Sequence, residues 1–261
     1  MPRIALGLQY DGSAFCGWQT QASACAVQDA LQRALRNFLH EEVQIVCAGR
    51  TDAGVHATYQ VVHFDTQRVR PLAAWVRGVN AQLPATIAVR WARVVPPDFH
   101  ARYSARARRY DYWILNDPVR APLLVGRVGW VFRPLDVTAM QQAAALLVGT
   151  HDFSAFRSAE CQAATPVREL RLLTVQRYGT LIRVRAVANA FLHHMVRNIV
   201  GTLVYVGLGR QPPQWAGEVL ARRNRALAAP TFSADGLYLT HVEYHPAFDL
   251  PAPQDVPPLL T

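Results

Sequence analysis

The spacing of apolar side chains divides the first hundred residues into four short strands and two helices. Between residues 27 and 39, apolar positions recur at helical spacing and form one stripe, with polar side chains opposite. The other predicted elements are strands at 3–10, 43–47, 59–65 and 87–94 and a second helix at 72–82. The order β-α-β-β-α-β is that of a ferredoxin-like, or split βαβ, module.

A second series of strands and helices follows in the rest of the chain. Residues 181–190 have one apolar face, as a half-buried strand does, whereas 192–206 is apolar nearly all round and predicts a buried helix. The remaining predicted elements are strands at 108–115, 170–176 and 237–244 and helices at 136–147 and 215–222.

We therefore expect an α+β protein built from two ferredoxin-like or RRM-like halves with antiparallel sheets. The expected domains are 1–100 and 101–245, followed by a proline-rich, extended tail at 246–261. Two such modules would form a central cleft, and clefts between modules are common ligand sites.

The composition indicates a polyanionic partner. The 261 residues are 51% hydrophobic, which allows a sizeable core, and the net charge of +9 favours nucleic acid. All 27 basic residues other than histidine are arginine, which suits phosphate and base contacts, although a genome biased toward arginine codons would give the same composition. The chain shows no bilayer-spanning apolar run and no signal peptide, so we expect a soluble cytoplasmic protein.

The four cysteines, at positions 16, 25, 47 and 161, form no recognisable pattern. None pairs as C-x-x-C, and no histidine cluster completes a zinc spacing. We expect reduced core or loop thiols, without a disulfide framework or a structural metal.

Asp52 lies in a loop, GRTDAGVHA (49–57), that joins two predicted strands. Aspartate followed closely by glycine is common in turns, where the carboxylate accepts hydrogen bonds from nearby backbone N–H groups. Alternatively, a nearby arginine would lower the pKa of the carboxyl group and keep it ionised as a nucleophile or base. Aspartate acts as a nucleophile at sugar carbons in covalent glycosyl transfer. The local pattern leaves both interpretations open.

Tyr110 lies in a basic and aromatic strand, RRYDYW (108–113). Period two places Tyr110 and Tyr112 on one face and Asp111 on the other. Aromatic side chains on a sheet with arginines beside them form a stacking platform for unpaired bases, but a core strand has the same pattern. The nearby arginines would suit phosphates, or would simply form a solvated basic face; they are Arg102, Arg106, Arg108 and Arg109.

Arg197 stands near the start of the predicted apolar helix. An arginine in such a place needs an anionic partner, for which Asp52, Asp152, Glu169 and an incoming phosphate are all candidates. The adjacent His193 and His194 diverge by about a hundred degrees if both are helical, so core or capping roles are favoured over a shared metal ion.

Six segments, in this order, resemble the tRNA pseudouridine synthase A family: YDGSAFCGWQ, GRTDAGVHA, FHARYSARARRYDYW, GTHDFSAFR, FLHHMVRNIVG and GLYLTHVEY. Together they extend over nearly the whole chain. The resemblance implies that uridine is isomerised to pseudouridine at positions 38, 39 and 40 of the tRNA anticodon stem-loop, after base flipping. It also implies a homodimer without metal or organic cofactor.

The same resemblance implies roles for individual residues. Asp52 would be the catalytic nucleophile, Tyr110 would stack on the target uracil, and Arg197 would pair with the Asp52 carboxylate. The expected substrate-binding residues beside Tyr110 are Arg50, Arg109 and His56, in a positively charged cleft.

Two other classes of protein share some of these features. A nucleoside or glycoside hydrolase would use a second carboxylate across from Asp52 as general acid, and no acidic residue accompanies Asp52 within its motif. An RNA-binding module without chemistry would explain the charge and Tyr110, but it would give Arg197 and the Asp52 loop no joint role. We therefore expect a tRNA-modifying isomerase.

Overall fold

The chain folds into two compact units in the computed structural model, which describes residues 1–253. The first unit consists of Met1–Arg106 together with the segment that begins at Tyr238, and the second consists of Ala107–Leu237. The division falls after Arg106 rather than near residue 100. The last strand belongs with the first unit, not with the second half as expected, because it pairs in parallel with a strand of that unit, Tyr238 opposite His56.

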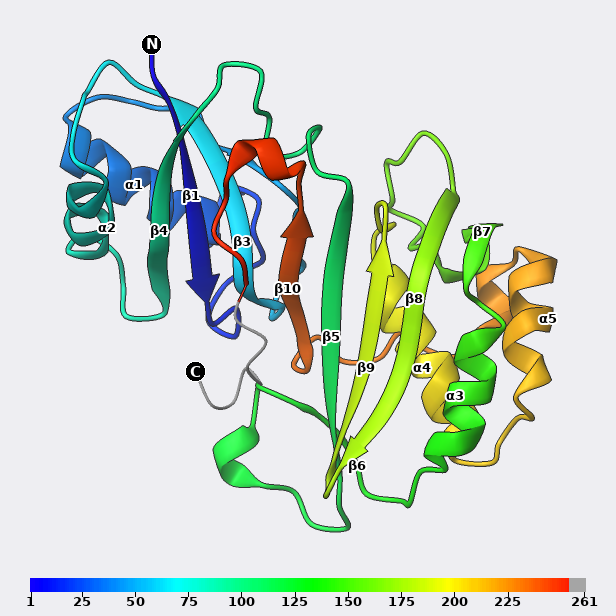
Figure 1. Cartoon of the computed structure of the whole chain (residues 1–261). Coiled ribbons are helices and arrows are strands. Elements are labelled where there is room, and N and C mark those ends of the chain that lie inside the picture. Colours follow the sequence, from blue (N-terminus) through cyan, green and yellow to red (C-terminus); the bar gives the residue numbers. More distant parts are fainter. Residues whose placement is uncertain (254–261) are drawn as a thin grey trace. The chain divides into compact units, whose positions relative to one another are not determined.

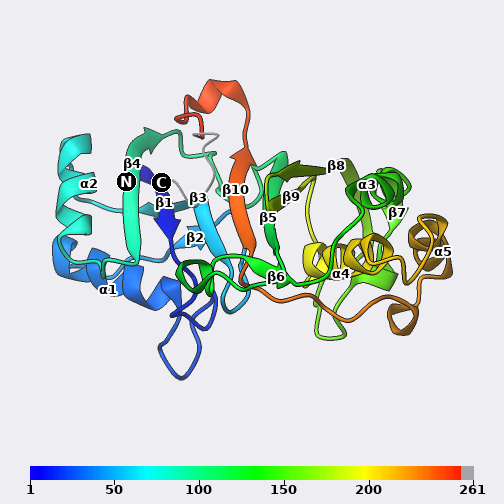
Figure 2. The ribbon, with the colours of Figure 1, turned by 90° about the horizontal axis from the view of Figure 1, so that it is seen from below.

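The first unit is a sheet covered by two helices (Figures 1 and 2). The strand order is β4-β1-β3-β10, with β2 paired to β3, and β1 is antiparallel to both of its neighbours. Its elements are β1 (Arg3–Tyr10), α1 (Val27–Leu39), β2 (Val46–Cys47), β3 (His56–Asp65), α2 (Leu72–Asn80), β4 (Ile87–Val95), β10 (Leu237–Glu243) and a 3-10 turn at Pro246–Phe248. The predicted β-α-β-β-α-β order is confirmed.

Helix α1 forms where the apolar stripe in the sequence predicts it. Its apolar stripe is buried, and Asp29 in the first turn accepts a hydrogen bond from the N–H of Ala26 at 3.0 Å. His40, with a left-handed backbone, ends the helix. Trp75 of α2 contacts the rings of Phe38 and Phe64 with centroids 5.5 and 5.7 Å apart, which joins both helices to the sheet.

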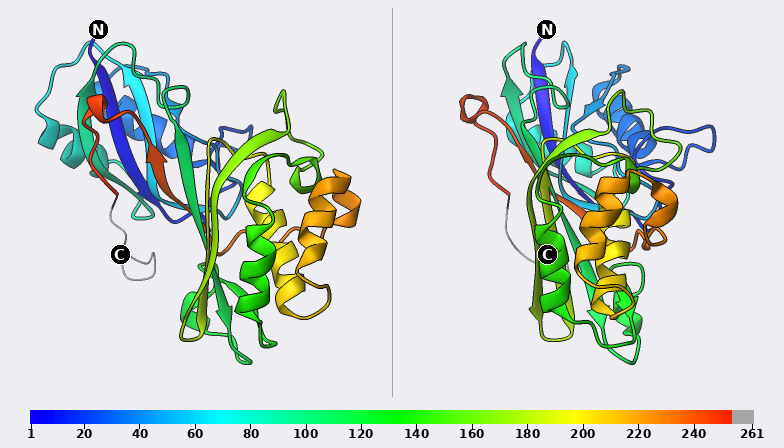
Figure 3. Two further views of the ribbon diagram at one scale, coloured as in Figure 1. Left: turned by 45° about the vertical axis from the view of Figure 1, so that its right-hand side comes forward. Right: turned by 90° about the vertical axis from the view of Figure 1, so that its right-hand side faces the viewer.

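The second unit has helices on one face of its own sheet, as Figure 3 shows. The strand order is β5-β9-β8-β7, with β6 parallel to β5. Its elements are β5 (Ala107–Asn116), β6 (Gly129–Val131), α3 (Val137–Ala145), β7 (Gly149–Asp152), β8 (Val167–Tyr178), β9 (Leu181–Ala188), α4 (Met195–Gly207), α5 (Gln214–Arg222) and 3-10 turns at Pro122–Leu124, Ser154–Phe156 and Arg225–Leu227. Helix α4 is buried along nearly its whole length, as predicted.

The α+β fold class is confirmed, with differences in detail. The pattern missed β6 and β7, which are too short to show an alternation and each begin with glycine. Within the expected tail, Phe248 packs on Phe99 with ring centroids 5.0 Å apart, and the Pro251 carbonyl accepts a hydrogen bond from Tyr59. Residues 246–253 are therefore packed on the first unit, and 254–261 lie outside the described residues.

The prediction of four reduced thiols is wrong for two cysteines. Cys16 and Cys25 form a disulfide with Cα atoms 5.5 Å apart, whereas Cys47 and Cys161 are free. The loop after β1 folds back on itself between the two, and such a return is not visible in a spacing of nine residues. Within the described residues, no helix is long and apolar enough to cross a membrane.

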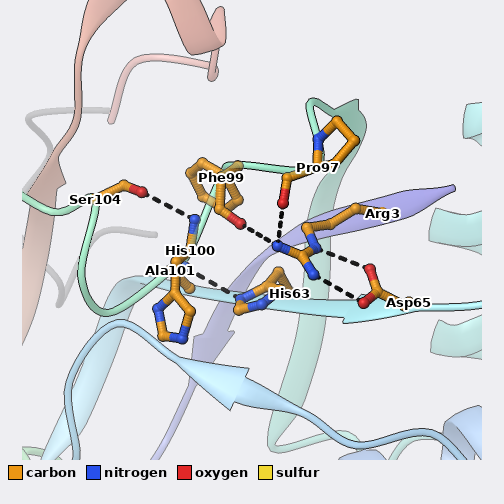
Figure 4. Close-up of polar contacts among 8 residues, drawn as sticks. All are labelled: Arg3, His63, Asp65, Pro97, Phe99, His100, Ala101 and Ser104. Carbon is orange, nitrogen blue, oxygen red and sulfur yellow. Dashed lines mark hydrogen bonds and ion pairs between the residues drawn. The ribbon is translucent and has the colours of Figure 1, made fainter. Parts of the chain in front are cut away.

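Arg3, at the start of β1, links three parts of the first unit (Figure 4). Its guanidinium forms two hydrogen bonds of 2.8 Å with the carboxylate of Asp65 on β3. It also donates to the backbone carbonyls of Pro97 and Phe99, at 2.6 and 2.8 Å. The segment after β4 is thereby fastened to the sheet by a charged group.

His63 lies beside this pair and is only 4% exposed. Its Nδ1 accepts a hydrogen bond from the backbone N–H of Ala101 at 3.1 Å, which requires an unprotonated nitrogen (Figure 4). Burial, with the positive charges of Arg3 and His100, lowers the pKa of His63 to about 4, and Asp65 opposes this shift. The imidazole is therefore neutral near pH 7.

We expect the segment held by His63 to loosen as the pH falls. The pKa of His63 is about 4 in the folded protein and near 6.5 in the unfolded chain, so the unfolded state binds more protons between these values and stability decreases as the pH drops through that window. Hydrogen exchange should show the protection factor of the Ala101 amide falling between about pH 6.5 and 4. His63→Asn should remove this dependence, and His40→Asn, at an exposed site, should retain it. A constant protection factor in the wild type would contradict the assignment.

Candidate active site

The loop that carries Asp52 is held by its neighbours in the first unit. The Thr51 hydroxyl lies 2.8 Å from the Tyr10 hydroxyl, and the Thr51 carbonyl accepts a hydrogen bond from the N–H of Trp18 at 2.9 Å. Gln60 of β3 donates to the Gly49 carbonyl at 2.7 Å. These contacts fix the backbone on both sides of Arg50 and up to Asp52.

Asp52 itself begins a tight turn. Its carbonyl accepts a hydrogen bond from the N–H of Val55 at 3.1 Å, and Gly54 has φ of 78°, a conformation that glycine adopts readily. The turn expected from the Asp-x-Gly spacing is present, and the Asp52 side chain remains partly exposed. A turn and a reactive carboxylate are therefore compatible at this position.

The loop between β1 and α1 lies directly on the Asp52 loop. A Cβ atom at Gly12 would come within 2.0 Å of the Val55 carbonyl oxygen, and one at Gly17 would lie 2.8 Å from that of Thr51. Only glycine permits so close an approach of two backbones. Sequence reasoning did not find these supports, since they join residues some forty positions apart.

His56 is a buried residue, 2% exposed, at the start of β3. Its Nδ1 accepts a hydrogen bond from the N–H of Gly12 at 3.0 Å and lies 3.2 Å from the Asp11 carboxylate. Its ring stacks on Tyr238 at 4.5 Å. These contacts suit a residue that positions the loop. The substrate contact that the resemblance implied for His56 stays a prediction.

Arg50 is exposed and follows Cys47, the last residue of β2, by three positions. Burial raises the pKa of the Cys47 thiol to about 11, while the positive charges of Arg50 and Arg102 act in the opposite direction. Both guanidinium groups therefore lie near β2. This places two arginines of the first unit close to the strand that leads into the Asp52 loop.

Tyr110 lies on β5 in the second unit and is 8% exposed. Its ring meets Phe191 edge to face, with centroids 5.1 Å apart. Tyr112, two residues on, donates a hydrogen bond to the Ser233 carbonyl at 2.9 Å, and burial raises the pKa of its hydroxyl. Arg109 is half-buried, in register with Val187 of β9.

Asp111 points away from Tyr110, as the strand alternation predicted. It lies opposite Arg185 in the antiparallel register, and two hydrogen bonds of 2.8 Å join the carboxylate and the guanidinium. Asp111 is 3% exposed, so this acid is neutralised inside the second unit and adds no open negative charge beside Tyr110.

Arg197 lies in the first turn of α4 and is half-buried. Its Nε donates to the Phe232 carbonyl at 2.9 Å, which fixes the base of the side chain. Of the acids considered as partners, Asp152 lies 3.6 Å from Arg223 and Glu169 lies 2.9 Å from Arg171. Asp52 belongs to the first unit and Arg197 to the second, so their pairing stays a prediction.

The two adjacent histidines lie outside the helix that was expected to contain them. Helix α4 begins at Met195, and His194 is its N-cap residue with a left-handed backbone, φ 61°. The rings of His193 and His194 therefore come close, with centroids 4.0 Å apart. The angular argument from helix geometry does not apply here, although the capping position was foreseen.

Comparisons with known proteins show the same family that the sequence segments resemble. A family model described as tRNA pseudouridine synthase matches residues 8–104 and 143–245. A protein of Paraburkholderia phytofirmans named tRNA pseudouridine synthase A is 59% identical over 254 residues, which cover 97% of this chain and 94% of that protein. Proteins of the same name from Herminiimonas arsenicoxydans and Thiobacillus denitrificans are each 57% identical, over 95% and 96% of this chain and 92% and 96% of their own.

Among solved structures, a chain from a Cbf5-Nop10-Gar1 complex covers 90% of this chain and 48% of its own, with 11% identity and a TM-score of 0.37, too weak a likeness to bear on the fold. The sequence matches decide the class instead: this chain belongs to the tRNA pseudouridine synthase family, whose members are isomerases.

Breaking the ion pair behind Tyr110 should destabilise the second unit. Asp111→Leu leaves Arg185 buried without its partner, which costs about 3–5 kcal/mol. The double variant Asp111→Leu/Arg185→Met should recover most of this loss, and Glu218→Ala, at an exposed position of α5, should unfold as the wild type does. Urea unfolding measures all three. If the double variant is as unstable as the single variant, the loss does not come from an unpaired Arg185.

Proposed function

We propose that this chain isomerises uridine to pseudouridine at positions 38, 39 and 40 of the tRNA anticodon stem-loop, with Asp52 as the catalytic nucleophile. The observation that carries the proposal is a partly exposed carboxylate on a fixed turn, within the GRTDAGVHA segment of a chain that belongs to this family. The net charge of +9 supports an RNA substrate. A homodimer, implied by the resemblance, and a cytoplasmic location, expected from the sequence, are part of the same proposal.

The chemistry begins with a flipped base. Extruding a uridine from its stack costs a few kcal/mol, and stacking on Tyr110 offsets about 1–3 kcal/mol of this. Arg197 stabilises the ionised form of Asp52 by its positive charge. Arg50 and Arg109 bind phosphates of the RNA backbone.

The reaction exchanges one bond at C1′ for another. The C1′–N1 bond breaks with assistance from Asp52, which either attacks C1′ or removes a proton from the sugar to leave a glycal. The detached uracil turns within the site and C5 bonds to C1′. This bond either displaces the Asp52 carboxylate from C1′ or, on the glycal route, forms as the proton returns to C2′. The C5 proton is then lost and N1 gains a proton. Composition is unchanged, as an isomerisation requires. Exclusion of water protects the intermediate from hydrolysis.

A hydrolase would release the base instead of rejoining it. That reaction needs a general acid across from the nucleophile. The only acid close to Tyr110 on its strand, Asp111, is paired with Arg185 on the opposite face. The Asp111 carboxylate is therefore not placed to act as that general acid.

The role of Asp52 is tested with tRNA tritiated at uridine C5. Wild type should release tritium, and Asp52→Asn, which keeps the shape of the turn, should lower the single-turnover rate by more than ~10³-fold because the nucleophile is lost. Asp29→Asn, at an acid in the first turn of α1, serves as the control and should release tritium normally. Absence of release by the wild type refutes the synthase function, and free uracil in the products would indicate a hydrolase.

The stacking role of Tyr110 calls for a separate pair of variants. Tyr110→Ala removes the ring and should lower the single-turnover rate on saturating tRNA by roughly 5- to 150-fold, the equivalent of 1–3 kcal/mol of stacking. Tyr110→Phe retains the ring and should stay within a few-fold of the wild type. If the phenylalanine variant is as slow as the alanine variant, the hydroxyl and not the ring is what matters.

A further inference from the structure

An exposed aromatic ring stands on the turn that follows β4 in the first unit. Tyr103 is 76% exposed, one face of its ring stacks on His100 with centroids 4.3 Å apart, and the guanidinium carbon of Arg102 lies 5.5 Å from its centroid. We propose that the turn 100–104 is a second RNA contact, where Tyr103 stacks on an unpaired base and Arg102 binds a neighbouring phosphate. This inference rests on the proposed function and concerns substrate binding alone.

The turn is fixed in advance of binding. Backbone N–H groups of all its residues donate to internal acceptors: His100 to the Ser104 hydroxyl at 2.9 Å, Ala101 to His63 at 3.1 Å, Arg102 and Tyr103 to the His100 Nδ1 at 3.2 and 3.1 Å, and Ser104 to the His100 carbonyl at 2.8 Å. Figure 4 shows two of these bonds and the Arg3 network that holds the preceding residues. A ring on so rigid a support loses little conformational entropy when a base stacks on it.

The turn also lies close to the approach to the Asp52 loop. His63, which holds Ala101, is paired in the sheet with Val46 of β2. The charges of Arg102 and Arg50 both act on the Cys47 thiol, which is the last residue of β2. The turn and the start of the Asp52 loop are therefore both neighbours of β2 in the same unit.

The chemistry favours RNA over a protein partner. A single tyrosine with exposed arginines on either side in sequence, Arg102 and Arg106, offers a stacking face with positive charge beside it. Base stacking on an aromatic ring together with a phosphate contact from arginine is the usual mode of binding single-stranded segments.

The test compares tRNA binding with turnover. Tyr103→Ala should raise the dissociation constant of the complex with unmodified tRNA by roughly 5- to 150-fold. The single-turnover rate of tritium release at saturating tRNA should stay at the wild-type value. Tyr103→Phe should bind as the wild type does. Arg102→Gln should weaken binding and lower the slope of log Kd against log salt by about 1. Tyr178→Ala, at an exposed tyrosine of the second unit, is the matched control and should bind normally.

Wild-type affinity for Tyr103→Ala would overturn the inference, as would an equal loss in the phenylalanine variant. The Ala101 amide protection factor verifies that the turn remains folded in each variant. The proposed function fails separately, if wild type binds tRNA through Tyr103 but releases no tritium. Loss of turnover at saturating tRNA in Tyr103→Ala would likewise count against a contact that serves binding alone.

Discussion

The Asp52 loop depends on Thr51, which is 6% exposed and engaged at both its hydroxyl and its carbonyl. Tyr10, the last residue of β1, contacts the Thr51 hydroxyl. Trp18, in the loop closed by Cys16 and Cys25, donates to the Thr51 carbonyl. An anchor immediately before a reactive residue aims the side chain without enclosing it. Asp52 can therefore remain partly exposed while hydrogen bonds hold its backbone and that of Thr51.

In the second unit, the alternation of side chains along β5 places Tyr110 and Asp111 in different surroundings. Tyr110 and Tyr112 occupy one face of β5, next to aromatic and backbone partners, and Asp111 is neutralised by Arg185 on the other. A strand with period two can thus carry an acid beside a stacking residue without placing negative charge near an RNA backbone. Acid and aromatic ring are neighbours in sequence but not in chemical surroundings.

Much of the fold was predictable because it depends on local pattern. Helix α1 and strands β1 and β9 begin within one residue of their predicted positions, since each carries a clear stripe or alternation. What the pattern missed depends on contacts between distant residues or on short segments. The Cys16–Cys25 bridge, the start of α4 at Met195 and the return of β10 to the first unit belong to this class.

The candidate site shows the same division. The GRTDAGVHA and RRYDYW segments identified Asp52 and Tyr110 through ordered likeness to a family, not through spacing, which left a turn and a core strand open as explanations. The expected substrate contact of His56 stays a prediction, and its burial against Tyr238 could be seen only after β10 was placed. Tyr103 passed unnoticed because its exposure follows from the turn that carries it.

The pairing of β10 with β3 also has a consequence for biosynthesis. The second unit, Ala107–Leu237, is an uninterrupted insertion between β4 and β10, so both ends of the first unit's chain must meet to complete its sheet. On the ribosome, the inserted unit emerges whole before β10 does. During that interval the β3 edge, which starts at His56 directly after the Asp52 turn, lacks its parallel neighbour. His56 also lacks the Tyr238 ring on which it stacks, so the surroundings of the Asp52 loop are completed only after the whole second unit has been made.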